Sequence, residues 1–125
     1  MIKSYKDLEV YQSAYQLAIV VHQTTQEYPD YERYEMGSQL RRAAISIPMN
    51  IGEGYGKKKS DKEFKRFLLM ALGSCNEVQV LLDMSKDLRY IDERKYTELT
   101  REYDLLGRRL NVMIGKWLTK PDPEV

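Results

Sequence analysis

The sequence is poor in the residues that most often build disulfides, metal sites and nucleophilic active sites. Among its 125 residues it has one cysteine, Cys75, and one histidine, His22. A single cysteine cannot form an internal disulfide, which is typical of proteins from a reducing cytoplasm. A single histidine within a helical stretch does not favour a histidine-rich zinc site or a Ser-His-Asp triad. We therefore expect neither a metal ion nor a cofactor.

Long apolar runs are also missing. The apolar-rich uncharged runs 43–52 and 67–76 have ten residues each, whereas a helix that crosses a bilayer needs ~20 apolar residues. The first residues, MIKSYKDLEV, lack the apolar segment of a signal peptide. With 42% hydrophobic and 31% charged residues, the composition is that of a globular, strongly helical protein. We expect a soluble, cytoplasmic protein with a single domain, residues 1–125.

Apolar residues recur in steps of three and four over most of the chain, which is the pattern of helices that pack together. The clearest stripe lies near the C-terminal end and consists of Tyr96, Leu99, Tyr103, Leu106, Leu110, Met113 and Trp117. Another stripe follows Ser60, which together with Glu63 matches a capping box. Because the linkers are short, we predict an all-α, up-down-up-down four-helix bundle. Its helices are expected at about 5–27, 34–55, 61–88 and 93–118.

The segment 39–56 combines a helical stripe with residues that break helices. Its apolar residues share one helical face: Leu40, Ala44, Ile47 and Ile51. Pro48 interrupts them, and proline inside a helix costs ~3 kcal/mol because it removes a backbone hydrogen bond. The alternation over 43–51 also suits an edge strand, but no other run offers a strand partner. We expect a helix that is kinked near Pro48 and ended by the glycines around 54–56.

The first predicted helix carries more apolar surface than a bundle of four helices requires. Leu8, Tyr11, Tyr15 and Ala18 form one face, and Val10, Ala14, Leu17 and Val21 form a second face. Two adjacent apolar faces indicate a contact with another subunit. The chain also has ten tyrosines, whose apolar rings with polar tips suit subunit interfaces and the rim of a monomer core equally well.

Few residues suggest catalysis. Cys75 lies on the apolar stripe of the third helix and is best explained as a core residue. Glu53 and Glu77 are candidates for a carboxylate pair, or for pairing with Arg41 or Arg42 across the bundle, and a buried Arg–Glu pair more often fixes register. The Glu-x-x-His pairs of di-iron bundles are missing, and the glycines after Ile51 lack the spacing of a phosphate-binding loop. We expect a protein that is not an enzyme.

Positive charge is concentrated at the turn into the third helix. Residues 57–66 have a net charge of +4, whereas residues 1–56 carry −2 and residues 67–125 carry −1. Such a cluster can neutralise phosphates, although in a monomer a solvated loop is the simpler explanation. Repeated around a ring, it would give a positive rim that attracts a polyanion. The candidate nucleic-acid contacts are Lys57, Lys58, Lys59, Lys62, Lys65 and Arg66.

Three ordered motifs resemble those of a bacterial protein family. They are Asp7-Leu8-x-Val10-Tyr11, Gln39-Leu40-x-Arg42-Ala43-x-x-Ser46-Ile47-x-x-Asn50-Ile51-x-Glu53-Gly54 and Phe67-Leu-x-x-Ala71-Leu-Gly73-Ser74-x-x-Glu77. They are similar to the four-helix-bundle proteins first recognised as reading frames in intervening sequences of 23S rRNA genes. The resemblance implies an up-down bundle that assembles as a homopentameric ring. It also implies structural or interface roles for the family-motif residues Arg42, Ser46, Asn50, Glu53 and Glu77.

More distantly, the chain is similar to the accessory variability protein of diversity-generating retroelements. That relative is a pentameric barrel that binds nucleic acid and its reverse transcriptase. We therefore consider two functions. The first is a non-enzymatic, ring-forming bundle that binds RNA or DNA weakly through a basic rim. The alternative is a protein–protein scaffold or adaptor with no nucleic-acid role.

Overall fold

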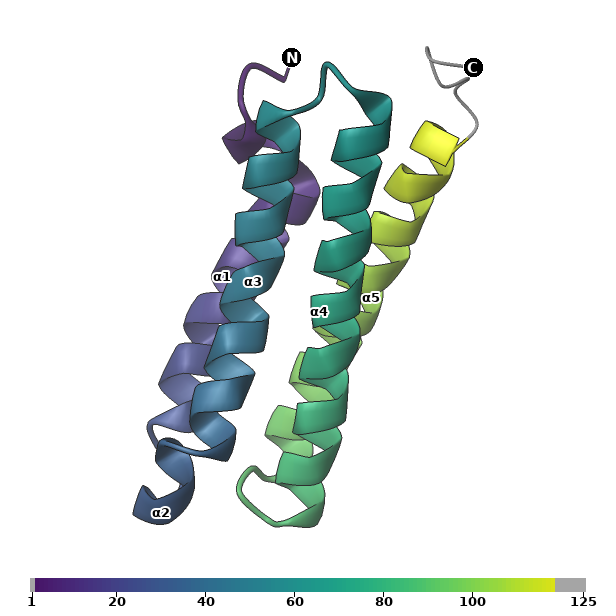
Figure 1. Cartoon of the computed structure of the whole chain (residues 1–125). Helices are drawn as coiled ribbons and strands as arrows, with labels where there is room; N and C mark the ends of the chain where they lie inside the picture. The colour runs from purple at the N-terminus through teal and green to yellow at the C-terminus, as the bar shows by residue number, and fades with distance from the viewer. Residues whose placement is uncertain (1, 119–125) are drawn as a thin grey trace.

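The computed structural model describes residues 2–118, which form four long helices and two short helical turns (Figure 1). This part of the chain contains no strand, so the strand alternative for residues 43–51 was wrong and the predicted all-α four-helix bundle is confirmed. In chain order the elements are the 3-10 turn η1 (Tyr5–Asp7), α1 (Glu9–Thr25), α2 (Asp30–Arg33), α3 (Met36–Gly56), α4 (Asp61–Asp87) and α5 (Glu93–Leu118).

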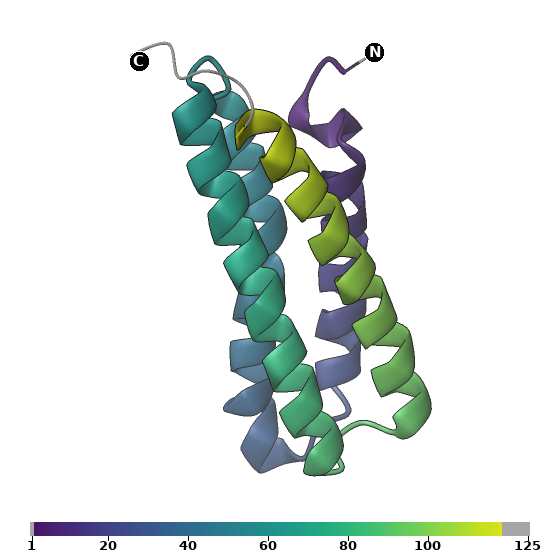
Figure 2. The same ribbon diagram turned by 90° about the vertical axis from the view of Figure 1, so that its right-hand side faces the viewer.

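The four long helices alternate in direction (Figures 1 and 2). α3 packs between α1 and α4, and α5 packs against α4 and makes fewer contacts with α1. As a result η1, the α3–α4 connection and the last turns of α5 lie at one end of the molecule. One continuous cluster of buried apolar side chains fills the interior, with fully buried members from all four long helices, among them Val21, Leu40, Leu68 and Leu106.

The first long helix begins later than the predicted residue 5. Ser4 and Asp7 form a capping box around η1, in which the Ser4 hydroxyl accepts a hydrogen bond from the Lys6 amide at 3.2 Å and the Asp7 carboxylate accepts one from the Ser4 amide at 3.1 Å. Leu8 is then extended, with φ −73° and ψ 128°, and separates η1 from α1. The spacing of apolar residues is the same with or without this break, so periodicity alone could not place it.

The predicted helix at 34–55 is preceded by the short helix α2, which sequence reasoning missed. The corner between α1 and α3 is closed by Arg41, whose guanidinium donates to the Thr25 hydroxyl at 2.8 Å and to the Arg33 carbonyl at 3.0 Å. Arg41 therefore joins the ends of three helices and is not the partner of a carboxylate across the bundle. The other two predicted helices, 61–88 and 93–118, agree with α4 and α5 to within one residue.

Pro48 lies inside α3, which is helical without interruption from Met36 to Gly56. Its ring is buried, and the apolar stripe around it is fully buried as well: Leu40, Ala44, Ile47 and Ile51. Packing against α1 and α4 therefore offsets the ~3 kcal/mol that proline costs inside a helix. The kink expected at this position stays a prediction.

α3 ends at Gly56, within the glycines where we expected the helix to end, but these glycines do not form a left-handed cap. No glycine between residues 2 and 118 has a positive φ, and Lys57 caps α3 at φ −109°. Gly54 is instead buried against α4, where an added Cβ would lie 2.6 Å from the Cβ of Phe67 and 3.2 Å from Cδ1 of Phe64. Gly54 therefore allows a close approach of two helices, whereas a Cβ at Gly56 would meet nothing within 4 Å.

We predict that Gly54→Ala lowers the free energy of unfolding by about 1–3 kcal/mol, which is the usual cost of overpacking a tight contact. The Cβ of Phe67 is attached to the α4 backbone, so it can only move if the helix moves. The matched control is Gly56→Ala, which should raise stability by up to about 1 kcal/mol through helix propensity. Urea unfolding followed by circular dichroism measures both. Stabilisation by Gly54→Ala would contradict the close-packing role.

Candidate nucleic-acid interface

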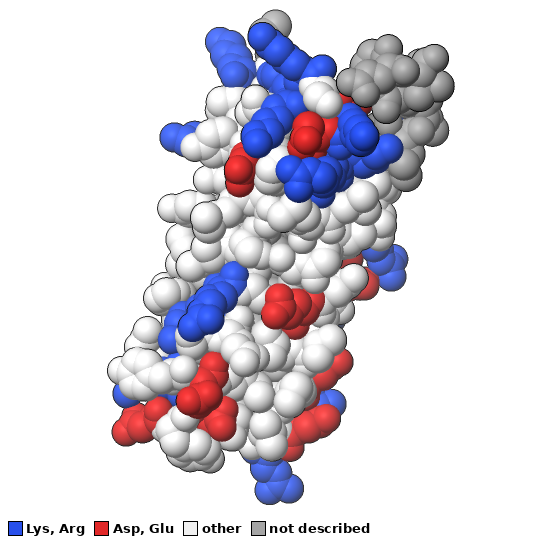
Figure 3. Space-filling view, in the orientation of Figure 1, with Lys and Arg blue, Asp and Glu red and all other residues white. Residues whose placement is uncertain are grey.

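The six basic residues proposed from the sequence lie together at one end of the bundle. They occupy the α3–α4 connection and the first turns of α4. Figure 3 shows basic side chains gathered at this end, next to a largely uncharged middle. All are exposed to solvent except Lys65, which is half-buried. The cluster, called the turn cluster below, consists of Lys57, Lys58, Lys59, Lys62, Lys65 and Arg66.

Aromatic rings hold three cations of the turn cluster. The Lys57 Nζ lies 5.2 Å and the Arg66 Cζ lies 4.7 Å from the centre of the Phe67 ring. The Lys58 Nζ lies 3.9 Å from the centre of the Tyr55 ring. A cation over an aromatic face gains ~0.5–1 kcal/mol at an exposed site. These three charges are therefore kept near the surface of the turn.

Acidic residues compensate only part of this charge. Glu63 pairs with Arg66 at 3.1 Å, with side chains that are 43% and 56% exposed, so the pair contributes only ~0–1 kcal/mol. The Ser60 hydroxyl accepts from the Glu63 amide at 3.2 Å, which is half of the predicted capping box. The other half is not formed, because the Glu63 carboxylate faces Arg66 and the Ser60 amide donates to the Lys57 carbonyl at 3.1 Å.

The turn cluster belongs to a larger basic end, defined here as residues 2–9, 53–66 and 104–118. These segments meet where η1, the α3–α4 connection and the last turns of α5 come together (Figures 1 and 2). They contain eleven basic and six acidic residues, a net charge of +5. The opposite end, residues 22–36 and 83–103, contains six basic and ten acidic residues, a net charge of −4 with His22 neutral. Charge is therefore separated along the long axis of the bundle.

Sequence reasoning missed the part of the basic end that lies outside residues 57–66. The start of α1, directly after η1, and the end of α5 are neighbours, since Leu8 and Val10 line an apolar groove of about 440 Å³ together with Met113. The predicted up-down topology could have identified these additional basic residues, because the start of the first helix and the end of the fourth meet at the same end of such a bundle. The residues missed are Lys3, Lys6, Arg108, Arg109 and Lys116.

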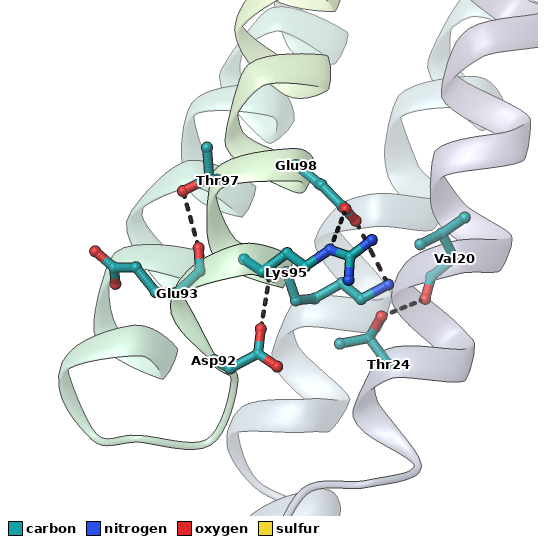
Figure 4. A network of polar contacts seen from close by, with 8 residues as sticks. Val20, Thr24, Asp92, Glu93, Lys95, Thr97 and Glu98 are labelled. Carbon is teal, nitrogen blue, oxygen red and sulfur yellow. Dashed lines mark hydrogen bonds and ion pairs between the residues drawn. The ribbon is translucent and has the colours of Figure 1, made fainter.

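At the opposite end, neighbouring carboxylates engage several of the cations. Figure 4 shows the first turns of α5, where Glu98 pairs with Arg94 at 3.2 Å and with Lys95 at 3.9 Å. Asp92 caps this helix, because its carboxylate accepts a hydrogen bond from the Lys95 amide at 2.7 Å. Combined with the net negative charge, these contacts leave no surplus of positive charge at this end.

A mostly apolar groove of about 680 Å³ runs between α1 and α3. Its α1 wall includes Tyr11, Tyr15 and Ala18 from the first of the two predicted faces, while the second predicted face, from Val10 to Val21, is buried in the core. From α3 it includes Ile45 and Met49, which are 41% and 65% exposed. The surplus of apolar surface expected on the first helix is therefore real, and it faces this groove.

Two of the five family-motif residues form hydrogen bonds inside the bundle, and the other three lie exposed on its surface. The Ser46 hydroxyl donates to the Ser74 hydroxyl of α4, and the Asn50 amide nitrogen donates to the Ser46 carbonyl at 2.8 Å. These bonds fit the structural role that the resemblance implies for Ser46 and Asn50. None of the ion pairs formed within residues 2–118 involves the motif glutamates. The remaining motif residues are exposed: Arg42, Glu53 and Glu77.

The described residues, 2–118, assemble no recognisable catalytic centre. Cys75 is buried, as expected for a core residue, and its thiol donates to the Tyr103 carbonyl at 3.2 Å. Burial raises the pKa of the Cys75 thiol to about 11, so it stays protonated near neutral pH. His22 lines the α1–α3 groove and is exposed. No group of three or more His, Cys, Asp or Glu side chains within these residues is placed to hold a metal ion.

Within residues 2–118, α4 is the one helix with the length and apolar composition of a membrane-spanning segment. Many of its apolar side chains are nevertheless buried in the bundle, among them Phe64, Leu68, Val78 and Leu82. The helix packs against α3 on one side and α5 on the other. A core helix between two neighbours has this composition for packing reasons, which accounts for the hydrophobicity of α4.

We predict that Cys75 resists modification by a thiol reagent at pH 8 in the native protein and reacts fully in denaturant. Rapid reaction of the native protein would contradict its burial. The contribution of this thiol to the unfolding free energy should be constant below about pH 9 and fall as the pH rises towards about 11, since the raised native pKa makes only the unfolded state lose the proton in this range. A Cys75→Ala variant, measured in parallel, should show a smaller decline.

Comparisons with known proteins identify relatives by sequence and by structure. The 23S rRNA-intervening sequence protein family matches residues 6–112. The fold is similar to the 1.70 Å crystal structure of a protein of unknown function from the S23 ribosomal protein family of Bacteroides thetaiotaomicron VPI-5482. The TM-score is 0.78 and the identity 21%, over 85% of this chain and 95% of that one. No curated protein matches significantly. Because the family match covers most of the helical bundle, the chain belongs to the 23S rRNA-intervening sequence protein family.

Proposed function

We propose that this protein is a non-enzymatic, cytoplasmic helical bundle that self-associates and binds RNA or DNA weakly through the turn cluster. The observation that carries this proposal is the exposed net charge of +4 on residues 57–66, at one end of a bundle whose other end is acidic. Lysine and arginine side chains placed in this way neutralise phosphates and release counterions on binding. The single, reduced thiol of Cys75 is compatible with the cytoplasm.

One turn cluster is small, so its affinity for nucleic acid should be low. It has six cations, and one of them, Arg66, is paired with Glu63. Non-specific phosphate contacts of this kind usually give a Kd of ~10⁻⁴–10⁻⁶ M at physiological salt. Self-association with the basic ends on the same side would place several clusters in one rim. A long nucleic acid could then contact several clusters at once, which raises the overall affinity.

We predict that the triple variant Lys57→Glu, Lys58→Glu, Lys59→Glu loses most of its affinity for RNA and DNA. Binding should also become less dependent on salt, because each phosphate contact contributes ~0.7–0.9 to the slope of log K against log salt. Three lost contacts lower that slope by about 2–3. The measurement is fluorescence anisotropy of a labelled oligonucleotide at several salt concentrations.

The matched control reverses three exposed cations at the opposite end, Arg89→Glu, Arg94→Glu and Arg101→Glu. This variant has the same net charge as the triple lysine variant. It should keep most of the affinity and the salt slope of the unmodified protein. An equal loss in the control would mean that net charge and not the turn cluster determines binding, and undiminished binding by the lysine variant would reject the site.

The α1–α3 groove supports the self-association part of the proposal. It exposes contiguous apolar and aromatic side chains, which monomeric proteins seldom leave in solvent, and tyrosine and methionine are enriched in subunit interfaces. A second copy of this chain is the occupant we propose. The scaffold alternative places a different protein in the same groove.

We predict that Ile45→Glu dissociates the assembly to monomers, because the substitution puts a charge in the apolar groove. Ile45 is 41% exposed, so the monomer fold should tolerate it. Leu105→Glu on α5 is the control, since Leu105 is 42% exposed and is not among the residues that line the groove. Light scattering of the three proteins gives their masses in solution. A monomeric unmodified protein would reject self-association and favour the scaffold alternative.

A further inference from the structure

We infer that the turn cluster recognises an extended phosphate chain by charge alone and does not read the bases. This inference rests on the proposed function and refines its site. The ligand class is a linear polyanion of closely spaced phosphates, which both a nucleic-acid backbone and inorganic polyphosphate provide.

The aromatic rings of the turn cluster are already covered. Proteins that bind single strands without sequence preference usually stack bases on exposed aromatic rings. Here Phe67 is only 5% exposed and lies beneath the charged groups of Lys57 and Arg66. The Tyr55 ring has Lys58 over it and meets Phe64 edge to face, with ring centres 6.4 Å apart at 89°. The rings therefore serve to hold cations and offer no free stacking platform.

The remaining aromatic side chain described in the basic end is also engaged. The Tyr5 ring lies against α3, where a Cβ at Gly52 would be 3.5 Å away, and it meets Tyr11 edge to face at 4.9 Å. It contributes to the wall of the α1–α3 groove. It belongs to that groove and not to the turn cluster.

Side chains that read base edges are missing or occupied in the same segment. Residues 53–66 include no asparagine or glutamine, which are the side chains that pair with adenine. Arginine and lysine can both pair with guanine. The Arg66 guanidinium, however, is stacked on Phe67 and paired with Glu63, and a lysine ammonium group is a flexible point charge that lacks the planar fork of arginine. What the cluster offers a polyanion is therefore ammonium groups and one engaged guanidinium, and these contact phosphates whatever the base.

The test is a competition experiment with the unmodified protein. A labelled oligonucleotide is bound first, and oligo(dA), oligo(dT), the RNA equivalents and long-chain polyphosphate are added as competitors at equal phosphate concentration. We expect all of them to displace the probe with midpoints that agree within about threefold, since each offers one charge per phosphate. A competitor series ordered by base, with polyphosphate ineffective, would overturn the inference and leave nucleic-acid binding itself intact. A probe that does not bind at all would reject the proposed function instead.

A variant at Tyr55 tests the role of the ring directly. If the ring stacked on bases, Tyr55→Leu would weaken oligonucleotide binding by about tenfold or more and leave polyphosphate binding unchanged. If the ring only positions Lys58, both ligands should lose affinity by the same modest factor. Tyr55→Phe keeps the ring and should bind both ligands as the unmodified protein does. If Tyr55→Leu does not fold, the competition with the unmodified protein still decides between the two outcomes.

Discussion

The close approach of α3 and α4 at Gly54 is the contact on which the rest of the structure depends. At that point there is no room for a methyl group, because it would lie 2.6 Å from the Cβ of Phe67. The contact fixes the Phe67 side chain at the start of α4, and this ring lies beneath Lys57 and Arg66. Further along the same seam, Ser46 and Ser74 join the two helices by a hydrogen bond. A packing constraint in the core thereby determines how charge is presented at the surface.

α3 has contacts on both of its sides, and this explains its unusual sequence. It packs against α1 and α4, so a proline within it is held by buried neighbours such as Ile47 and Ile51. The same helix contributes Ile45 and Met49 to the α1–α3 groove and ends at the turn cluster. A single helix, α3, therefore contributes residues to the core and to the α1–α3 groove, and it leads directly into the turn cluster.

Helix periodicity was sufficient to predict the bundle and the bounds of α5. The apolar stripe of α5 has no break, and Asp92 marks where this helix starts. Other features depend on residues far away in the chain. The role of Gly54 is decided by Phe67 on a neighbouring helix, so its own sequence context resembled a helix end. The break at Leu8 depends on hydrogen bonds of Ser4 and Asp7 that leave apolar spacing unchanged. The turn cluster was visible as a local run of charge, whereas Lys3 and Arg109 become part of the basic end only through the topology of the bundle.

The separation of charge along the bundle has a consequence for assembly. Chains that associate side by side in the same direction bring their basic ends together, so electrostatic repulsion at that end opposes the assembly. A polyanion that bridges neighbouring basic ends removes this repulsion. By thermodynamic reciprocity, such a ligand strengthens subunit association by the same factor by which association strengthens ligand binding. The number of subunits and the occupancy of the basic ends would then form one coupled equilibrium, in which neither quantity can be measured independently of the other.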